Sequence, residues 1–218
     1  LSERFRIPVI LLLDTFLGHL SERVVLEPPG EIVDRPKPKV APEHYLTFDA
    51  EGADIPAMAD FGGPYRSKII GNMHTKAGGY TRNPEIFESL IAHWRDKVVS
   101  RKSEYTDIER AMLEDARVAV VTWGSTTRSV KKAIRMARTE GIRVGLFRPR
   151  TVWPFPEQEI SELSETVDHM VVPEMNLGQM LVEVERWSRG RCGIHPVNQV
   201  SGEAILPDRI LEKIKEVA

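Results

Sequence analysis

The stretch that decides the fold is residues 115–160, DARVAVVTWGSTTRSVKKAIRMARTEGIRVGLFRPRTVWPFPEQEI. Its β-branched run 118–121 predicts a buried strand, which ends at the small polar residues 124–127. The next segment carries apolar residues at the spacing of one helical face: Val130, Ala133, Ile134 and Ala137. A second apolar run at 142–147 predicts another strand, and two strands joined by one helix form a right-handed βαβ unit. The fold class predicted is α/β.

Further elements follow this unit along the chain. A helix is predicted from Pro156, a strand at 169–173, an amphipathic helix from Leu177, a strand at 194–200 and a last helix from Pro207. This alternation of strands and helices is typical of a mostly parallel sheet covered on both faces.

Two helices are predicted before the unit. Asn83-Pro84 is a helix start, and the expected buried stripe of that helix is Phe87, Leu90, Ile91, Trp94 and Val98. Thr106 and Glu109 have the spacing of a capping box, which predicts a second helix that ends before Asp115.

The N-terminal third has a different character. Residues 1–6 resemble the last turn of a helix, and the apolar run 7–13 predicts a fully buried parallel strand. Such a strand needs neighbours that the nearby sequence does not supply, so we expect the chain to be a piece of a longer protein. Residues 27–64 are rich in proline and glycine and predict a domain linker, and 65–71 predicts a short strand.

Composition limits the classes of function. The chain has 218 residues, 41% of them hydrophobic and 28% charged, and such a length can bury about 70% of its unfolded surface. The net charge of −2 offers no attraction to nucleic acid. The run 7–13 is far shorter than the ~20 residues that span a bilayer. We therefore expect neither nucleic acid nor a membrane as a partner.

The single cysteine, Cys192, bears on compartment and cofactors. One cysteine forms no internal disulfide, which fits a reducing compartment, and we expect the protein to be cytoplasmic. Nor can one cysteine hold an iron–sulfur cluster by itself. We expect this chain alone to bind no metal and no cofactor.

Candidate ligand residues follow the predicted strands, where open α/β sheets place their ligands. Ser125 could bind phosphate at a helix N-terminus or cap that helix. Glu174, Asn176 and Gln179 could contact a ligand, and Glu174 could equally cap the following helix. Arg148 could contact an anion or form an interface ion pair. His74 lies in a glycine-rich loop, where a hydrogen-bonded histidine that holds the turn is the favoured interpretation. None of the residues is assigned a catalytic role.

Four segments together resemble a known family. They are IPVILLLDTFLGHLSERVVL at 7–26, YRSKIIGNMHTKAGGYTRNPE at 65–85, AVVTWGSTTRSVKKAIRMARTEGIRVGLFRPRTVWPFPE at 119–157 and VVPEMNLGQMLVEVER at 171–186. In this order they resemble the C-terminal half of the alpha subunit of 2-oxoacid:ferredoxin oxidoreductases, and the 2-oxoglutarate type most closely. One position departs from the family pattern: Thr75-Lys76-Ala77 follows His74 where an acidic pair is usual, which leaves the substrate class open.

The resemblance implies an architecture. Residues 1–26 would contain the last strand of an N-terminal pyrimidine-binding domain, 27–64 the linker, and 65–218 a domain similar to the transketolase C-terminal domain. That domain is a three-layer α/β/α sandwich on a mostly parallel five-stranded sheet with one antiparallel edge strand. Residues 65–71 are the natural candidate for that edge.

The resemblance also implies an activity of a holoenzyme, the oxidative decarboxylation of a 2-oxoacid to an acyl-coenzyme A. Thiamine diphosphate, Mg²⁺ and iron–sulfur clusters would supply the chemistry, and ferredoxin would accept the electrons. The partners implied are a beta subunit and possibly gamma and delta subunits. The family's catalytic residues have no counterpart here, so this piece would serve domain docking and subunit association, and the isolated chain would be inactive.

Two alternatives stay open. The chain could be a free-standing α/β module without catalytic activity that binds a small molecule or nucleotide at the end of the sheet bearing Ser125, Glu174 and Gln179. It could also be a structural interaction module with no ligand. The predicted strand 7–13 and the long linker favour the enzyme subunit, because an independent module needs neither.

Overall fold

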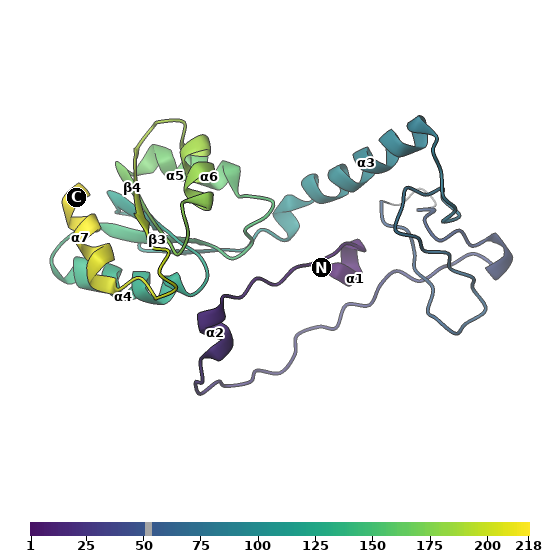
Figure 1. The fold of residues 1–218 in the computed structure, drawn as a ribbon, viewed down its shortest axis with the longest axis horizontal. Coiled ribbons are helices and arrows are strands. Elements are labelled where there is room, and N and C mark those ends of the chain that lie inside the picture. Colours follow the sequence, from purple (N-terminus) through teal and green to yellow (C-terminus); the bar gives the residue numbers. More distant parts are fainter. Residues whose placement is uncertain (51–53) are drawn as a thin grey trace. The chain divides into compact units, whose positions relative to one another are not determined.

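The computed structural model describes residues 1–50 and 54–218, drawn in Figure 1, so residues 51–53 of the predicted linker lie outside the described residues. The chain divides into two compact units. The first comprises Leu1–Leu11 and Arg23–Tyr105, and the second comprises Leu12–Glu22 and Thr106–Ala218. The predicted domain of residues 65–218 therefore includes a stretch, 65–105, that the structure groups with the first unit.

The second unit is built on a sheet of five strands in the order β1-β3-β2-β4-β5. Their bounds are Ile108–Ala111, Val118–Val121, Val144–Pro149, His169–Glu174 and Gly193–Asn198 for β1 to β5. Neighbouring strands are parallel except at one edge, where β1 runs antiparallel to β3. This confirms the mostly parallel five-stranded sheet with one antiparallel edge strand.

Helices cover both faces of this sheet (Figure 1). On one face α4 (Thr126–Thr139) and α7 (Pro207–Val217) pack over Val118, Val120 and their neighbours. On the other, α5 (Glu157–Thr166) packs with Ala119 and Val121, and α6 (Gln179–Ser188) lies beside α5. Two separate apolar cores result, one on each side of the sheet, which is the predicted three-layer α/β/α sandwich.

The antiparallel edge strand is β1, and the prediction that residues 65–71 form it was wrong. The backbone N–H of Lys68 donates to Thr47 Oγ1 at 3.0 Å, and the Tyr65 hydroxyl donates to the Val40 carbonyl at 3.0 Å. Residues 65–71 thus belong to the first unit, where they bind the Thr47 side chain and the Val40 backbone of the proline-rich segment 27–64, called the connector below.

The helix predicted from Thr106 was also wrong, because β1 occupies that position. Ile108 packs against the core under α5, whereas Ala111 packs against the core under α4. Side chains that alternate between opposite faces fit the period of a strand, and four residues are too few to reveal that period in the sequence.

A charge cluster joins β1 to its neighbours around Glu109. The carboxylate pairs with Lys131 of α4 at 2.5 Å, and with Arg148 of β3 at 3.0 Å. Arg150 makes a third contact at 3.3 Å. The hydrogen bond from Lys131 is the largest influence on the Glu109 pKa; with Arg148 it outweighs burial and lowers that pKa to about 2. Glu109 therefore binds the edge strand to both β3 and the helix above it.

The first unit contains short helices and a long one. They are α1 (Ser2–Phe5), the 3₁₀ turns η1 (Pro42–His44) and η2 (Lys102–Glu104), and α3 (Pro84–Val99), which Asn83 caps as predicted. The unit is held by Arg6, whose guanidinium donates to the Thr47 carbonyl at 2.7 Å and lies 4.9 Å from the centre of the Phe48 ring. Loop 72–81 closes through an isolated bridge between His74 and Tyr80.

Two apolar surfaces are exposed where burial was predicted. Residues 7–13 form no strand with any described residue, and Ile10, Leu11 and Leu12 are 79%, 82% and 70% exposed. The predicted stripe of α3 is likewise open, since Phe87, Ile91 and Trp94 are all exposed. The prediction of a buried strand at 7–13 was therefore wrong for the described residues, and so was the predicted burial of Phe87, Ile91 and Trp94, because no described surface covers these side chains. Among the described helices, none is long and apolar enough to cross a membrane.

Replacing Glu109 by Gln should lower the free energy of unfolding by about 1 to 2 kcal/mol at pH 7. The pKa shift would suggest more, but Lys131 and Arg150 are 41% and 49% exposed, and solvent screens their charges. Because the folded-state pKa is depressed, the carboxylate stabilises the fold fully above about pH 4.5 and loses this effect as pH falls toward 2. Urea unfolding of both proteins at several pH values measures the difference.

The matched control for this test is Asp96→Asn, which removes a carboxylate that pairs with Arg95 on the exposed surface of α3. This change should leave stability nearly unaltered. An E109Q deficit that persists unchanged at pH 3 would show that the deficit is not electrostatic.

Candidate functional site

The carboxyl ends of β2 and β4 form the point where open α/β folds bind ligands. These two strands are neighbours, and the chain leaves β2 toward α4 on one face and leaves β4 toward α6 on the other. The divergence of the two connections is a topological switch point. Four candidate residues lie at this end of the sheet: Glu174 ends β4, Asn176 follows it in the loop, Gln179 begins α6, and Ser125 precedes α4.

Glu174 caps α6. Its carboxylate accepts the backbone N–H groups of Met180 at 3.2 Å and Leu181 at 3.0 Å, and the side chain is only 2% exposed. Both donors belong to the first turn of the helix, whose N–H groups have no partner within the helix. Of the two interpretations of Glu174, the structure therefore shows the helix cap, in which each carboxylate oxygen accepts one hydrogen bond.

Asn176 has a similar role in the same loop. Its Oδ1 accepts the backbone N–H groups of Gly178 at 2.7 Å and Gln179 at 3.2 Å, while its own carbonyl accepts Asn198 Nδ2 at 3.1 Å. Gln179 is the first residue of α6, and its side chain is exposed. The loop is thus stabilised by hydrogen bonds of Asn176 to its own backbone and to Asn198 of β5.

The Ser125 side chain is hydrogen-bonded to Asp14, a residue that the sequence analysis did not single out. Its hydroxyl donates to Oδ2 of Asp14, whose Oδ1 accepts the backbone N–H of Leu17 at 2.8 Å. Asp14 thereby caps α2 (Thr15–His19) and lies at the start of α4. Burial raises the pKa of Asp14, but hydrogen bonds from Ser125 and Leu17 outweigh it and leave the pKa below its ordinary value.

A second contact fixes the same segment. Glu22 accepts both terminal nitrogens of Arg128 at 2.7 and 2.9 Å, so the two ends of residues 14–22 bind the first turn of α4. The Asp-Thr pair at 14–15 suggests a helix cap in the sequence. The partner at Ser125, far along the chain, is not encoded in any local pattern.

Arg148 and His74 do not join this site. Arg148 pairs with Glu109 in the charge cluster at the sheet edge, which is an ion pair within the second unit and not the predicted interface ion pair. His74 lies in the first unit, is 5% exposed, and stacks on Phe48 with ring centres 3.7 Å apart. Its Nδ1 is 3.2 Å from the Thr75 carbonyl oxygen. These contacts agree with a histidine that holds its loop.

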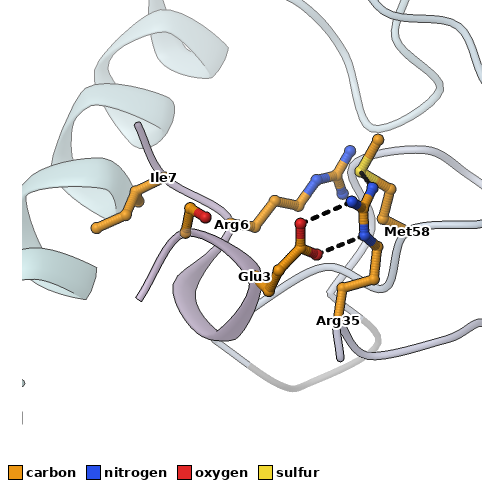
Figure 2. Close-up of a pocket in the computed structure, with 6 residues that line it drawn as sticks. Glu3, Arg6, Ile7, Arg35 and Met58 are labelled. Atoms are coloured by element: carbon orange, nitrogen blue, oxygen red, sulfur yellow. Dashed lines mark hydrogen bonds and ion pairs between the residues drawn. The ribbon is translucent and has the colours of Figure 1, made fainter. Parts of the chain in front are cut away.

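The first unit also contains a cavity of about 170 Å³, shown in Figure 2 and lined by Ser2, Glu3, Arg6, Ile7, Arg35 and Met58. Its cationic groups already have partners. Glu3 binds Arg35 through two hydrogen bonds of 2.6 and 2.7 Å, and Arg6 is directed to backbone carbonyls of the connector. Neither arginine in the cavity wall is therefore available to bind an added anion without giving up its present partner.

The donor groups do not fit the cofactors that the sequence resemblance implied. A cluster of iron and sulfur needs several thiolates, and the sequence contains only Cys192. Among the residues that the structure describes, no group of three or more His, Cys, Asp or Glu side chains could hold a metal ion.

Replacing Glu174 by Ala should lower the free energy of unfolding by about 2 kcal/mol, because two buried N–H groups of α6 lose their acceptor. Glu174→Gln keeps one acceptor oxygen and should cost roughly half as much. Urea denaturation followed by far-UV circular dichroism measures both changes. Equal stability of E174A and the parent chain would show that Glu174 does not serve as a structural cap.

Comparison with known proteins identifies the chain's relatives. Residues 116–210 match the family model described as pyruvate:ferredoxin oxidoreductase core domain II. The chain is 37% identical to the 2-oxoglutarate synthase subunit KorA of Methanothermobacter marburgensis over 98% of its own length and 57% of that subunit. It is 29% identical to the ketoisovalerate oxidoreductase subunit VorB of Methanothermobacter thermautotrophicus, over all of this chain and 54% of that subunit. The chain thus spans little more than half the length of these relatives.

A solved structure agrees with these relatives. The 2-oxoglutarate:ferredoxin oxidoreductase of Magnetococcus marinus, with 2-oxoglutarate, coenzyme A and succinyl-CoA bound, superposes with a TM-score of 0.73 and 25% identity. The match covers 85% of this chain and 32% of that one. The predicted resemblance is confirmed: the chain belongs to the family of 2-oxoacid:ferredoxin oxidoreductases and corresponds to part of an alpha-type subunit.

Proposed function

We propose that this chain is part of the alpha subunit of an enzyme that converts 2-oxoglutarate and coenzyme A to succinyl-CoA and CO₂. Two electrons would pass to ferredoxin in each turnover. The support is the higher identity to the 2-oxoglutarate synthase subunit than to the ketoisovalerate subunit, 37% against 29%. The solved relative with 2-oxoglutarate and succinyl-CoA bound points the same way.

Within that enzyme, the role proposed for these residues is docking between domains and subunits. The observation that carries this role is the run of exposed apolar side chains at 9–13, each at least 53% exposed. Exposed apolar runs of this kind are typical of interaction surfaces, since burial of each large side chain contributes about 1.5 to 3 kcal/mol. The exposed stripe of α3, with Phe87, Ile91 and Trp94, is a second surface of the same kind.

The chemistry would be supplied elsewhere in the enzyme. Thiamine diphosphate, Mg²⁺ and iron–sulfur clusters are proposed to bind other parts of the holoenzyme, with a beta subunit as the direct partner and gamma and delta subunits as further candidates. The domain assignment of residues 1–26 to a pyrimidine-binding domain is part of this proposal, as is a cytoplasmic location.

The alternative of a free-standing ligand-binding module has less support. It requires open polar groups at the carboxyl end of the sheet, whereas Ser125 is bound to Asp14 and Glu174 to the N–H groups of α6. An added ligand would have to displace these intramolecular partners.

A pair of variants with matched exposure tests the docking role. Leu11 and Leu177 are 82% and 83% exposed, and only Leu11 lies in the apolar run. In the complete alpha subunit, Leu11→Asp should weaken association with the beta subunit at least tenfold, because a charge replaces a buried apolar side chain. Leu177→Asp should leave association unchanged. Co-purification and analytical ultracentrifugation measure both, and equal affinity of the two variants would contradict the docking role.

The substrate is tested separately on the assembled enzyme. The ratio kcat/KM for 2-oxoglutarate should exceed that for 2-oxoisovalerate and pyruvate by at least tenfold, measured as coenzyme A-dependent reduction of ferredoxin. A distal carboxylate that is recognised by a buried polar group gives discrimination of this size or more. A preference for 2-oxoisovalerate would refute the proposed substrate while leaving the docking role intact.

A further inference from the structure

Two histidines face each other on neighbouring strands at the amino end of the sheet, away from the ends described above. Nδ1 of His169 on β4 lies 3.1 Å from Nε2 of His195 on β5, with ring centres 5.1 Å apart. The register pairs His169 with Gly193 and Val171 with His195. Since alternate residues share a face, both rings lie on the face that α4 and α7 cover.

Gly193 makes this approach possible. A Cβ at this position would lie 2.5 Å from His169 Nδ1 and 2.9 Å from His195 Nε2, closer than real contacts allow. Any other residue at 193 would therefore push the rings apart. The backbone of β5 thus provides a recess in which two ring nitrogens meet.

The distance suits a shared metal ion as well as a hydrogen bond. Imidazole nitrogens bind Zn²⁺ at about 2.0 to 2.1 Å, so two of them around one ion lie roughly 3 to 3.4 Å apart for bond angles between 90° and 109°. Imidazole is a preferred ligand of Zn²⁺, Cu²⁺ and Ni²⁺. Turning both lone pairs from the N–N line toward one ion takes a rotation of roughly 35 to 45° at each ring, which is the base angle of the triangle formed by the two nitrogens and the ion.

The groups around His195 favour its neutral form. Burial lowers the pKa of His195, and the nearby His169 and Lys213 lower it further, while Glu216 acts in the opposite sense. Lys213 and Glu216 of α7 form an ion pair at 2.5 Å. Cys192 is excluded as a third ligand, because it packs with Ile194 on the opposite face of the sheet.

We propose that His169 and His195 form a two-histidine site for a divalent transition-metal ion, Zn²⁺ or Cu²⁺, on the edge pair β4–β5. Water molecules complete the coordination. In the neutral pair one ring donates its N–H to the other. On metal binding that ring shifts its proton to its second nitrogen, so both facing nitrogens offer lone pairs and no net proton is released. The bound ion links the edge strand β5 to β4.

The test uses the untagged 218-residue chain and metal alone, since a polyhistidine tag would bind the same ions. Calorimetric titration with ZnCl₂ at pH 7.5 should show one site, and Zn²⁺ should raise the melting temperature. His169→Gln and His195→Gln should each weaken binding roughly tenfold or more. His44→Gln removes an exposed histidine in the other unit and should change nothing.

The variant Gly193→Ala tests whether the close approach of the two rings is needed, because it leaves both histidine ligands in the sequence. It retains both histidines, and a backbone without positive φ accepts alanine, but the methyl group displaces the rings. Zinc affinity should fall as far as in H169Q. If the far-UV spectrum shows that G193A does not fold, the two histidine variants decide the outcome by themselves.

Two further readouts complete the test. Electron paramagnetic resonance of the chain with one equivalent of Cu²⁺ should show two nitrogen ligands, reduced to one in either histidine variant. Affinity should drop at pH 5, where protons compete for the rings. Absence of binding at millimolar zinc, or binding that H169Q and H195Q leave intact, would overturn the proposal.

Discussion

Complete burial of β2 on both faces is the constraint on which the sheet unit depends. Residues 118–121 are at most 1% exposed, with Val118 and Val120 in one core and Ala119 and Val121 in the other. A strand buried on both faces must have strands on both sides and helices above and below it. The right-handed connection β2-α4-β3 covers one face, so the connection β3-α5-β4 must cover the other. Together these requirements place β4 beside β2 and create the switch point between them.

The polar groups at that switch point stabilise the fold instead of leaving a site open. Asp14, Glu174 and Asn176 each accept N–H groups at the start of a helix or in the turn before it, and each therefore replaces the anion that such a position would attract. A ligand at this end of the sheet would therefore have to displace these intramolecular partners.

The sequence predicted the elements whose pattern is long and whose partners are near. The strand 118–121, the helix after it, which ends before Gly141, and the cap at Asn83 all follow from local periodicity or capping chemistry. The edge strand β1 was missed because four residues carry too little periodicity, and its stability comes from Glu109 contacting residues far along the chain. For the same reason the Asp14–Ser125 contact could not be predicted. Of the candidate site, sequence placed the residues at the correct end of the sheet but could not decide between ligand and cap, because that choice depends on which partners folding brings close.

The exposed apolar run 7–13 lies between two residues whose side chains are held by hydrogen bonds. On one side, Arg6 is bound to backbone carbonyls of the first unit, and on the other, Asp14 is bound to Ser125 of the second. Residues 8–14, which include the rest of the chain between these two anchors, form neither a helix nor a strand with the described residues, and each apolar side chain among them would gain from burial. A simple tether between two units needs no apolar residues and would be more soluble with polar ones. The composition of the run from Ile7 to Leu13 is therefore unfavourable for a segment that stays in water, and this is the physical argument behind the proposed docking role.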